Sequence, residues 1–242
     1  MIDIHTHIIY DVDDGSDTLE ESIAILKKAS INGVTDIILT PHYIDEGRFN
    51  KEKIVENFNL LLEKVKEEEI PIKIYLGNEI AIYGNVTKIL QDERVETLAN
   101  SKYILIEFPM GTDVDYVLDT IYEIKLKKLV PVIAHPERCE CFVKHPELIN
   151  EAVNEGALLQ CNTGSLLGIY GLRAKKIVKK LLKDNLITFF ATDTHKEKNR
   201  RYKELHLVQD EVEKIVGRYE KNKLFIYNAR NILLNNDITK ED

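Results

Sequence analysis

The sequence predicts an α/β fold in which parallel strands alternate with helices and close into a barrel. Three observations lead to this prediction. Short apolar runs rich in β-branched residues recur along the whole chain, amphipathic segments with helical spacing separate most of them, and polar side chains follow each run. In a closed parallel barrel the carboxyl ends of all strands surround one mouth, whereas an open sheet spreads them along a line. A barrel therefore explains why histidines and carboxylates recur at these ends.

The elements follow one another in a regular order. The first apolar run, 2–4, leads to a helix expected over 18–30, where Leu19 and Ile23 share one face and Gly33 fits the stop. The same helical spacing marks the later helices, and short β-rich runs mark the later strands. The strands are expected at 36–40, 72–76, 103–108, 130–134, 157–161 and 187–191, and the helices at 52–69, 115–128, 146–154 and 173–185, with covering helices after residue 202.

Composition and charge narrow the classes of function. The chain has 242 residues, 44% hydrophobic and 31% charged, as in an ordinary globular protein. The net charge is −8 and no Lys/Arg-rich face stands out, which argues against nucleic-acid binding. The longest uncharged stretch, 156–172, contains four glycines, so we expect no membrane insertion. We expect one domain over 1–242, with a polar tail of about eight residues at its end.

The cysteines and the first residues bear on location. Three cysteines, an odd number in a long chain, do not make a disulfide framework. The N-terminus has no basic segment followed by an apolar core, so no secretory signal is predicted, and we expect a reduced, cytoplasmic protein. Cys139 and Cys141 form a pair without a second pair, and we expect them to pack rather than to bind metal. Cys161 is expected to be a core thiol.

Residue types that bind metals follow the predicted strands. His5 and His7 lie two residues apart on one strand, so both imidazoles point to the same face and can bind one ion. The wider set comprises five histidines and four carboxylates: His5, His7, Asp14, His42, Glu79, Glu107, His135, Asp193 and His195. Nine ligands are too many for one ion and enough for two, and with one bridging carboxylate three ions would receive about ten contacts. Metal ions would also remove the cost of burying unpaired carboxylates, which is several kcal/mol each.

Two arginines lie in loops at the same predicted mouth. Arg138 follows His135 by three residues, and Arg200 follows His195 by five. A guanidinium group binds phosphate oxygens bidentately, so beside a metal cluster both arginines are candidates for phosphate binding. Four carboxylates against three divalent ions leave a charge of roughly +2, which suits a phosphate dianion.

The motifs that carry these residues resemble the polymerase and histidinol phosphatase (PHP) superfamily, and within it the CpsB/CapC/YwqE type of bacterial protein-tyrosine phosphatase. The segments MIDIHTHIIYDVDDG, LTPH, GNEI, LIEFP, VIAHPER, NTGSL and TDTH occur in the family's order from residue 1 to about 235. The resemblance implies a distorted seven-stranded barrel with a trinuclear metal site at the carboxyl ends of the strands. It implies manganese, with iron, zinc or magnesium as alternatives.

The resemblance also divides the ligands among three ions. One ion would be held by His5, His7, Glu79 and Asp193, the second by Glu79 as a bridge with Glu107 and His135, and the third by Asp14, His42 and His195. Asp11 or Asp13 stays an alternative to Asp14. The two arginines match the family's phosphate-binding arginines, and Asp3 is expected to orient a ligand histidine.

The activity implied by the resemblance is metal-dependent hydrolysis of phosphotyrosine in proteins. The implied partner is the tyrosine-rich tail of a bacterial tyrosine kinase, in the control of capsule or exopolysaccharide synthesis. Which kinase, which polymer and which oligomeric state stay open. The main alternative is an enzyme of the same superfamily that acts on a small phosphomonoester such as histidinol phosphate. For a peptide substrate, we expect the aromatic ring to pack at the rim near Tyr43 or Phe108.

Three further classes fit less well. A cysteine-nucleophile phosphatase is excluded, because it needs an arginine six residues after its cysteine and none of the three cysteines has one. The string IIYDVDDG mimics an aspartate-nucleophile phosphatase, but that class has no use for five histidines at strand ends. A non-catalytic, metal-bound regulatory barrel is disfavoured because every motif keeps its ligands.

Overall fold

The strands form two parallel sheets in the computed structural model, which describes residues 1–44, 49–198 and 201–238. Across those residues one sheet has the order β1 (Ile2–Asp3), β2 (Asp36–Leu39) and β4 (Lys73–Leu76). The other has the order β3 (His42–Tyr43), β5 (Glu79–Ala81), β6 (Tyr103–Glu107), β7 (Val130–Ala134), β8 (Leu158–Asn162) and β9 (Phe189–Ala191). Every pair of named strands is parallel, so the predicted α/β class is confirmed.

The second and third predicted strands are found as β2 and β4, and each is followed by a further short strand, β3 or β5, which the apolar runs do not predict. The chain passes from β2 to β3 at Pro41 and from β4 to β5 at Gly77. Proline has no N–H to donate to a ladder, so a strand interior is interrupted there. The Gly77 N–H still donates to the Leu39 carbonyl over 2.9 Å, which keeps the two segments side by side across the break. The register beyond it pairs His42 with Glu79.

The segment after β1 connects the ends of the two sheets. Within residues 5–7, the His7 N–H donates to the Thr194 carbonyl over 2.9 Å. On the other side of this segment, the Thr40 N–H donates to the Thr6 carbonyl over 2.8 Å. The carboxyl ends of β1, β2 and β9 therefore lie together.

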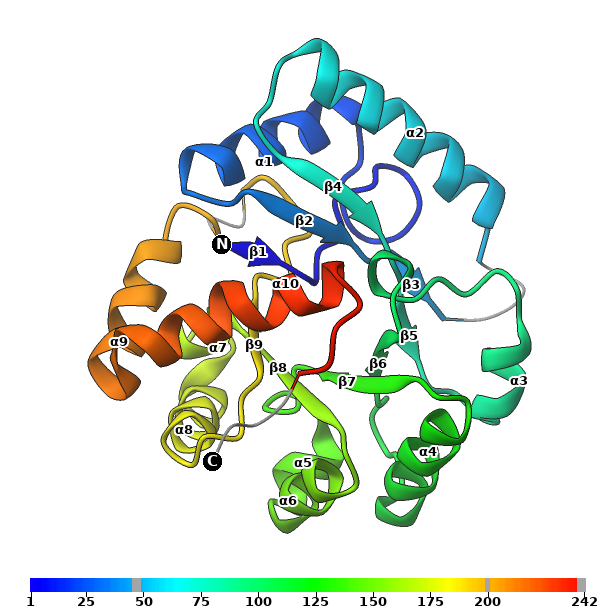
Figure 1. Ribbon diagram of the computed structural model, residues 1–242, viewed down its shortest axis with the longest axis vertical. Helices are drawn as coiled ribbons and strands as arrows, with labels where there is room; N and C mark the ends of the chain where they lie inside the picture. Colours follow the sequence, from blue (N-terminus) through cyan, green and yellow to red (C-terminus); the bar gives the residue numbers. More distant parts are fainter. Residues whose placement is uncertain (45–48, 199–200, 239–242) are drawn as a thin grey trace.

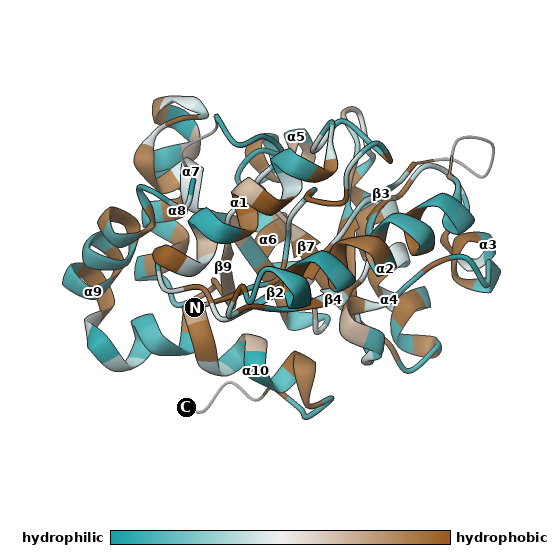
Figure 2. Cartoon of the chain, turned by 90° about the horizontal axis from the view of Figure 1, so that it is seen from above, coloured by the Kyte–Doolittle hydropathy of each residue, from teal (hydrophilic) through white to brown (hydrophobic). Residues whose placement is uncertain are grey.

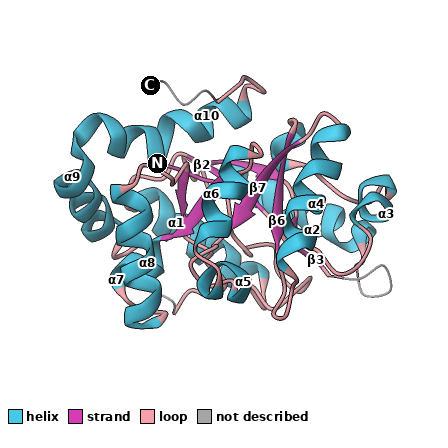
Figure 3. Cartoon of the chain, turned by 90° about the horizontal axis from the view of Figure 1, so that it is seen from below, coloured by secondary structure: helices cyan, strands magenta, loops and turns pink. Residues whose placement is uncertain are grey.

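Helices surround the strands (Figures 1 and 3). Five expected helices are confirmed as α1 (Leu19–Ile31), α2 (Lys51–Glu67), α4 (Val114–Leu126), α6 (Glu147–Asn154) and α8 (Gly171–Lys183). Thr18 caps α1 by accepting a hydrogen bond from the Glu21 N–H. The described residues also form α3 (Val86–Gln91), α5 (Glu140–Lys144), α7 (Thr163–Leu167), α9 (Leu205–Asn222) and α10 (Asn228–Leu233), a 3₁₀ turn at Leu98–Asn100 and a π-helical turn at Lys223–Tyr227. Among the helices described, none is long and apolar enough to cross a membrane.

One apolar cluster is lined by strand residues of both sheets. Alternate strand residues such as Leu105 and Val132 line it, because successive side chains of a strand point to opposite faces. The cluster contains Ile2 and Tyr103, at the starts of β1 and β6, together with Ile232 of α10. Helix α10 thus covers the amino ends of the strands, on the opposite side from α5 and α7 (Figure 2). The polar residues gather at the carboxyl ends instead.

Candidate metal centre

The structure brings all nine predicted ligands together at the carboxyl ends of the strands. They come from the segment after β1, from β3, β5 and β6, and from the segments after β7 and β9. Overlapping sets of their donor atoms lie within 4.8 Å of one another, in four groups: His7, Asp14, His42 and His195; His5, His7 and Asp193; His5, Glu79 and His135; and His42, Glu79 and Glu107. Most of the nine are buried, and Asp14 lies on the exposed side of the cluster.

Glu79 lies at the centre of the cluster. Its Oε2 is 3.2 Å from Nε2 of both His5 and His7 and 3.1 Å from Nδ1 of His42. Its Oε1 is 2.9 Å from Nε2 of His135. Burial alone raises the pKa of a carboxyl group, but the surrounding histidines outweigh it and hold the pKa of Glu79 well below its ordinary value. Glu79 is therefore ionised and shared by four imidazoles.

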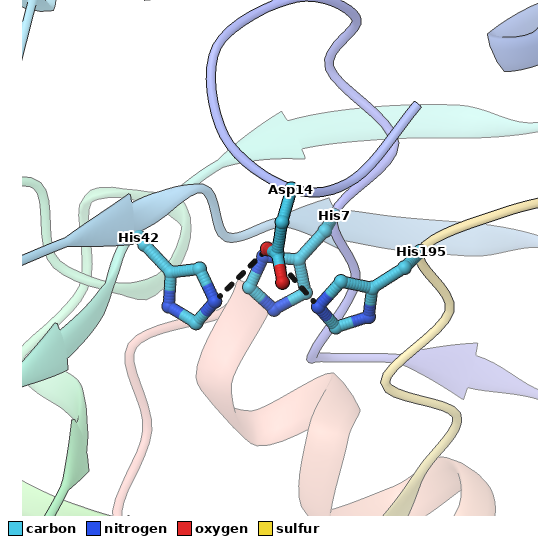
Figure 4. A group of neighbouring side chains, drawn as sticks. All are labelled: His7, Asp14, His42 and His195. Atoms are coloured by element: carbon cyan, nitrogen blue, oxygen red, sulfur yellow. Dashed lines mark ion pairs between the residues drawn. The ribbon is translucent and has the colours of Figure 1, made fainter. Parts of the chain in front are cut away.

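Asp14 closes the outer side of the cluster. Its Oδ1 is 3.4 Å from Nε2 of His42 and 3.4 Å from Nε2 of His195, and it points between the two rings (Figure 4). His195 and His42 together lower the pKa of the Asp14 carboxyl group far below its ordinary value. Asp11 instead pairs with Lys53 at the surface, over 2.8 Å. Of the aspartates in this loop, Asp14 is the one that faces His42 and His195.

The separations between donor atoms fit metal coordination. Two ligands that each lie about 2.1 Å from one ion stand roughly 3.0 to 3.4 Å apart at octahedral to tetrahedral angles. His42 Nδ1 and Glu79 Oε2 are 3.1 Å apart, yet within the described part of the chain this buried nitrogen has no hydrogen-bond partner. A ring nitrogen and a carboxylate oxygen at this separation, with no hydrogen bond between them, fit two ligand atoms of one shared cation. Imidazole and carboxylate ligands suit several divalent first-row metals.

Polar neighbours fix the rings of the two strand histidines. His5 Nδ1 lies 2.8 Å from Oε1 of Gln160, and His7 Nδ1 lies 2.8 Å from Oδ2 of Asp13. Each contact uses Nδ1 and turns Nε2 toward the cluster, as is usual for histidines that bind metals. The sequence offers two signals for these partners, since Gln160 interrupts an apolar run and Asp13 is next to the predicted ligand Asp14.

The hypothesis that Asp3 orients a ligand histidine is wrong. The Asp3 carboxylate accepts hydrogen bonds from the Thr192 N–H and hydroxyl, over 3.0 and 2.6 Å, and from the Tyr202 hydroxyl, over 2.9 Å. Asp3 therefore ties β1 to the end of β9 and to the segment before α9. The reason is position along the strand, because Asp3 shares a face with His5 and His7 but lies two residues before His5, farther from the strand ends where the ligands gather.

The backbone is strained at two ligand positions and crowded at a third residue. His135 and Asp193 have φ values of +31° and +52°, a region that residues other than glycine rarely occupy. A Cβ atom at Gly15 would lie 2.0 Å from the His7 carbonyl oxygen, so this position admits no side chain. Strain of this kind persists where surrounding contacts impose a geometry, and here they impose the positions of the ligands.

Arg138 lies at the edge of the cluster. Its Nη1 donates to Oδ2 of Asp193 over 2.7 Å, and its guanidinium carbon is 4.1 Å from the centre of the Tyr170 ring. The Tyr170 hydroxyl accepts a hydrogen bond from the buried Arg201 over 2.9 Å. Arg200 lies outside the described residues. Tyr170 and Arg201 did not emerge from the sequence, because each lies several residues beyond the end of its strand, β8 or β9, outside the strand-end motifs.

The prediction that the aromatic ring of a substrate packs near Tyr43 or Phe108 is wrong. Tyr43 is 2% exposed and Phe108 3% exposed, so neither ring is available to a substrate. The Tyr43 hydroxyl donates to Asp92 over 2.7 Å. The half-exposed Tyr170, stacked on Arg138, is the aromatic side chain that does lie beside the cluster.

The cysteines pack in the protein interior, as predicted. Cys139, Cys141 and Cys161 are all free and buried, and Sγ of Cys139 is 3.2 Å from Sγ of Cys141. Among the described residues, no cysteine belongs to a group with metal-ligand geometry. Burial raises the pKa of the Cys161 thiol well above its ordinary value, which disfavours a nucleophilic role.

Asp13→Asn is expected to lower metal affinity by about 10- to 100-fold, because the carboxylate that holds the His7 ring is lost. Asp11→Asn is the matched control, since Asp11 lies two residues away and pairs with a surface lysine. Metal dissociation constants from competition with a fluorescent chelator test this prediction. Equal affinities for the two variants would contradict the role given to Asp13.

Metal affinity is expected to rise with pH up to about 9. Burial alone lowers the pKa of His42, but the nearby carboxylates of Asp14 and Glu79 outweigh it and raise this pKa to about 9, and the pKa values of His7 and His135 are also raised. These protonated rings stabilise the metal-free protein below pH 6.5, and this contribution is lost as the pH rises through about 9. A metal binds neutral imidazole, so it must displace these protons.

Calorimetric titration of Mn²⁺ into chelator-treated protein, in two buffers of different ionisation enthalpy, measures the protons released. We expect the protein to release protons when it binds Mn²⁺ at pH 7, and the His42→Ala variant to release fewer. The control His206→Ala, whose ring is exposed on α9, should release as many as the unmodified chain. An affinity that does not vary with pH would refute the protonated state of these histidines.

Comparisons with known proteins place the chain in a family. A family model described as "Capsular polysaccharide synthesis, CpsB/CapC" matches residues 1–234. Tyrosine-protein phosphatase YwqE of Bacillus subtilis is 38% identical over 204 residues, which cover 84% of this chain and 80% of the relative. Tyrosine-protein phosphatase CpsB of Streptococcus pneumoniae is 32% identical over 241 residues, which cover 97% of this chain and 98% of the relative.

Solved structures agree with the family match. One chain from the crystal structures of YwqE from Bacillus subtilis and CpsB from Streptococcus pneumoniae, described as unique metal-dependent tyrosine phosphatases, has a TM-score of 0.90 and 36% identity, covering 100% of this chain and 97% of that one. Histidinol phosphate phosphatase from Lactococcus lactis, at 14% identity and a TM-score of 0.56, covers 87% of this chain and 93% of its own length and shares the fold alone. The chain belongs to the CpsB/CapC family.

Proposed function

We propose that this protein is a metal-dependent tyrosine phosphatase that acts on phosphotyrosine in proteins. The observation that carries the proposal is the cluster of histidines and carboxylates around Glu79, with the Arg138 guanidinium at its edge. Relatives named tyrosine-protein phosphatases, 32% to 38% identical over most of the chain, support the same activity here. The family's role in capsular polysaccharide synthesis supports a bacterial tyrosine kinase, phosphorylated on its tail, as the substrate.

We propose that three divalent ions occupy the site, with manganese as the metal and iron, zinc or magnesium as alternatives. The sharing of His5, His7, His42 and Glu79 between neighbouring ligand groups supports adjacent ions rather than separate ones. The proposed ligand sets follow the family resemblance and the pairwise distances: His5, His7, Glu79 and Asp193; Glu79, Glu107 and His135; and Asp14, His42 and His195. Ions held there supply Lewis-acid polarisation of phosphoryl oxygens and, from water, a nucleophile at neutral pH.

The chain's own contribution to the reaction is to bind and orient the phosphoryl group. Arg138 uses one N–H to bind Asp193, which leaves other N–H groups of its planar fork for phosphoryl oxygens. Stacking on Tyr170 holds the guanidinium plane, so its charge is positioned before the substrate arrives. Arg200 is proposed as a second phosphate ligand on its motif alone. The leaving tyrosyl oxygen has an ordinary pKa of about 10, so it needs little help from an acid.

We also propose that the two sheets act as one distorted seven-stranded barrel that forms a single domain over 1–242. The hydrogen bond from His7 to Thr194 supports this, since it links the β1 end of one sheet to the β9 end of the other, and the bonds from Thr40 to Thr6 and from Gly77 to Leu39 extend the pairing of β2 with β1 and β4 beyond the strands. Closure would surround the ligand cluster with strand ends. The cytoplasmic location stays a prediction.

Arg138→Ala is expected to lower kcat/KM on a phosphotyrosine peptide by about 100-fold or more while metal content stays unchanged, because a charge that stabilises the transition state is lost. Arg218→Ala is the control, since its side chain is 81% exposed on α9. Metal analysis alongside steady-state kinetics measures both quantities. An unchanged rate would show that Arg138 does not contact the phosphoryl group.

The substrate class is tested by comparing kcat/KM for phosphotyrosine peptides and for histidinol phosphate on one manganese-loaded preparation. We expect efficient turnover of peptides and weak turnover of histidinol phosphate. Chelation should abolish both activities, and alkylation of the buried thiols should leave them intact, because the proposed nucleophile does not come from cysteine. A preference for histidinol phosphate would overturn the tyrosine phosphatase assignment and leave the metal site in place.

A further inference from the structure

A groove outside the metal centre lies between α8 and the pair α5 and α6. Its volume is about 270 Å³. Figure 1 shows these three helices next to one another on the outside of the strands. Its floor is apolar, with the buried side chains of Phe142, Ile149 and Leu181. A recessed apolar floor of this size accommodates one or two apolar side chains of a partner.

One wall of this groove is a stripe of basic side chains. Arg173, Lys176 and Lys180 line it, and Lys183 continues the stripe at spacings of three and four residues, so all four share one face of α8. They are exposed, and within the described part of the chain no ion pair joins them to a carboxylate. Lys179, on another face, does form one with Glu211.

The stripe corrects the expectation that no Lys/Arg-rich face exists. The net charge of −8 averages over the whole chain and hides a local excess of positive charge on α8. Asp184 is the acidic residue that lines the groove, at the end of the helix. The potential over the groove therefore favours an anionic partner.

The groove begins next to the metal centre. Helix α5 starts two residues after Arg138, and α8 starts one residue after Tyr170, which is stacked on that arginine. Arg173 Nη2 donates to the Val143 carbonyl over 3.1 Å and joins the two walls at this near end. The groove thus opens within about one helical turn, roughly 5 Å along the axis, of residues beside the cluster.

We propose that this groove binds the acidic segment that flanks phosphotyrosine in a protein substrate. We call it the basic groove, and it is formed by Phe142, Ile149, Arg173, Lys176, Lys180 and Leu181. The proposal rests on the proposed tyrosine phosphatase activity and extends it to substrate selection. From Arg173 to Asp184 the helix rises about 17 Å, which an extended peptide spans in roughly five residues. The occupant is an extended peptide that carries Asp or Glu toward the lysines and one apolar side chain into the floor.

A peptide fits the groove better than a membrane surface does. A helix that lies on a bilayer places its apolar face outward to enter the lipid, with the charges at its flanks. Here the floor residues Phe142, Ile149 and Leu181 are buried behind the basic wall. They can receive a side chain that enters the groove, but they cannot protrude into a bilayer.

The test uses the manganese-loaded full chain and the double substitution Lys176→Glu with Lys180→Glu. The substrates are two phosphotyrosine peptides with an acidic and apolar flank before or after the tyrosine, a peptide with neutral flanks, and p-nitrophenyl phosphate. We expect the unmodified chain to prefer one acidic peptide over the neutral one by about tenfold in kcat/KM. The substitution should remove this preference through KM and leave turnover of p-nitrophenyl phosphate unchanged.

Lys127→Glu with Lys128→Glu is the matched control, because both lysines are exposed after α4 and the change in charge is the same. The milder Lys176→Gln with Lys180→Gln should give an intermediate loss. A preference that survives in Lys176→Glu with Lys180→Glu, or falls equally in the control, would overturn the proposal. So would an enzyme that shows no acidic preference and binds vesicles of phosphatidylserine and phosphatidylcholine through these lysines.

Anisotropy of a labelled, unphosphorylated acidic peptide separates this proposal from the proposed function. Its binding needs no hydrolysis, and the double substitution should weaken it by about tenfold. A chain that binds the peptide but hydrolyses no phosphotyrosine would contradict the phosphatase assignment alone. A chain that hydrolyses phosphotyrosine peptides with the same kcat/KM whatever their flanking residues would contradict only the proposed role of the basic groove.

Discussion

The contact of one buried carboxylate with four imidazoles is the constraint on which the arrangement depends. Glu79, at the start of β5, is reached by histidines from the segments after β1 and β7 and from β3. An ionised carboxylate removed from water costs several kcal/mol unless opposite charges or metal ions surround it. These segments must therefore converge on one point. The short strand β3 after β2 serves this convergence, since it leaves the line of β2 and pairs His42 with Glu79.

The residues around this contact hold the ligands in place before a metal arrives. Asp13 and Gln160 fix two rings, and the positive φ values of His135 and Asp193 are maintained by the packing of neighbouring segments. The loops that continue from these positions carry the Arg138 guanidinium and the start of the basic groove. The candidate metal ligands, the Arg138 guanidinium and the near end of the basic groove thus lie on consecutive stretches of the same loops, which suits the proposed binding of a phosphorylated peptide.

The sequence predicted well which histidines and carboxylates gather at one site, and predicted poorly which neighbours they contact. The direction of a strand fixes the end of the sheet at which a residue lies, and the two-residue period fixes the face to which its side chain points. These two rules were enough to place nine candidate ligands at the carboxyl ends of the strands. Which neighbour a side chain meets depends on direction and distance in the fold, and so Asp3 was assigned to a histidine although it binds Thr192. The pairing of β3 with β5 beyond Pro41 and the stacking of Tyr170 depend in the same way on tertiary contacts. The basic face of α8 was missed because a whole-chain charge conceals a local one.

The most direct test of this account is the metal content and phosphotyrosine turnover of Glu79→Gln, measured by elemental analysis beside Glu107→Gln. Glu79 belongs to two ligand groups and Glu107 to one. The account predicts that Glu79→Gln loses more than one bound ion together with its turnover, and that Glu107→Gln loses no more than one ion. A Glu79→Gln variant that keeps the full metal content and activity would contradict the central role of this carboxylate.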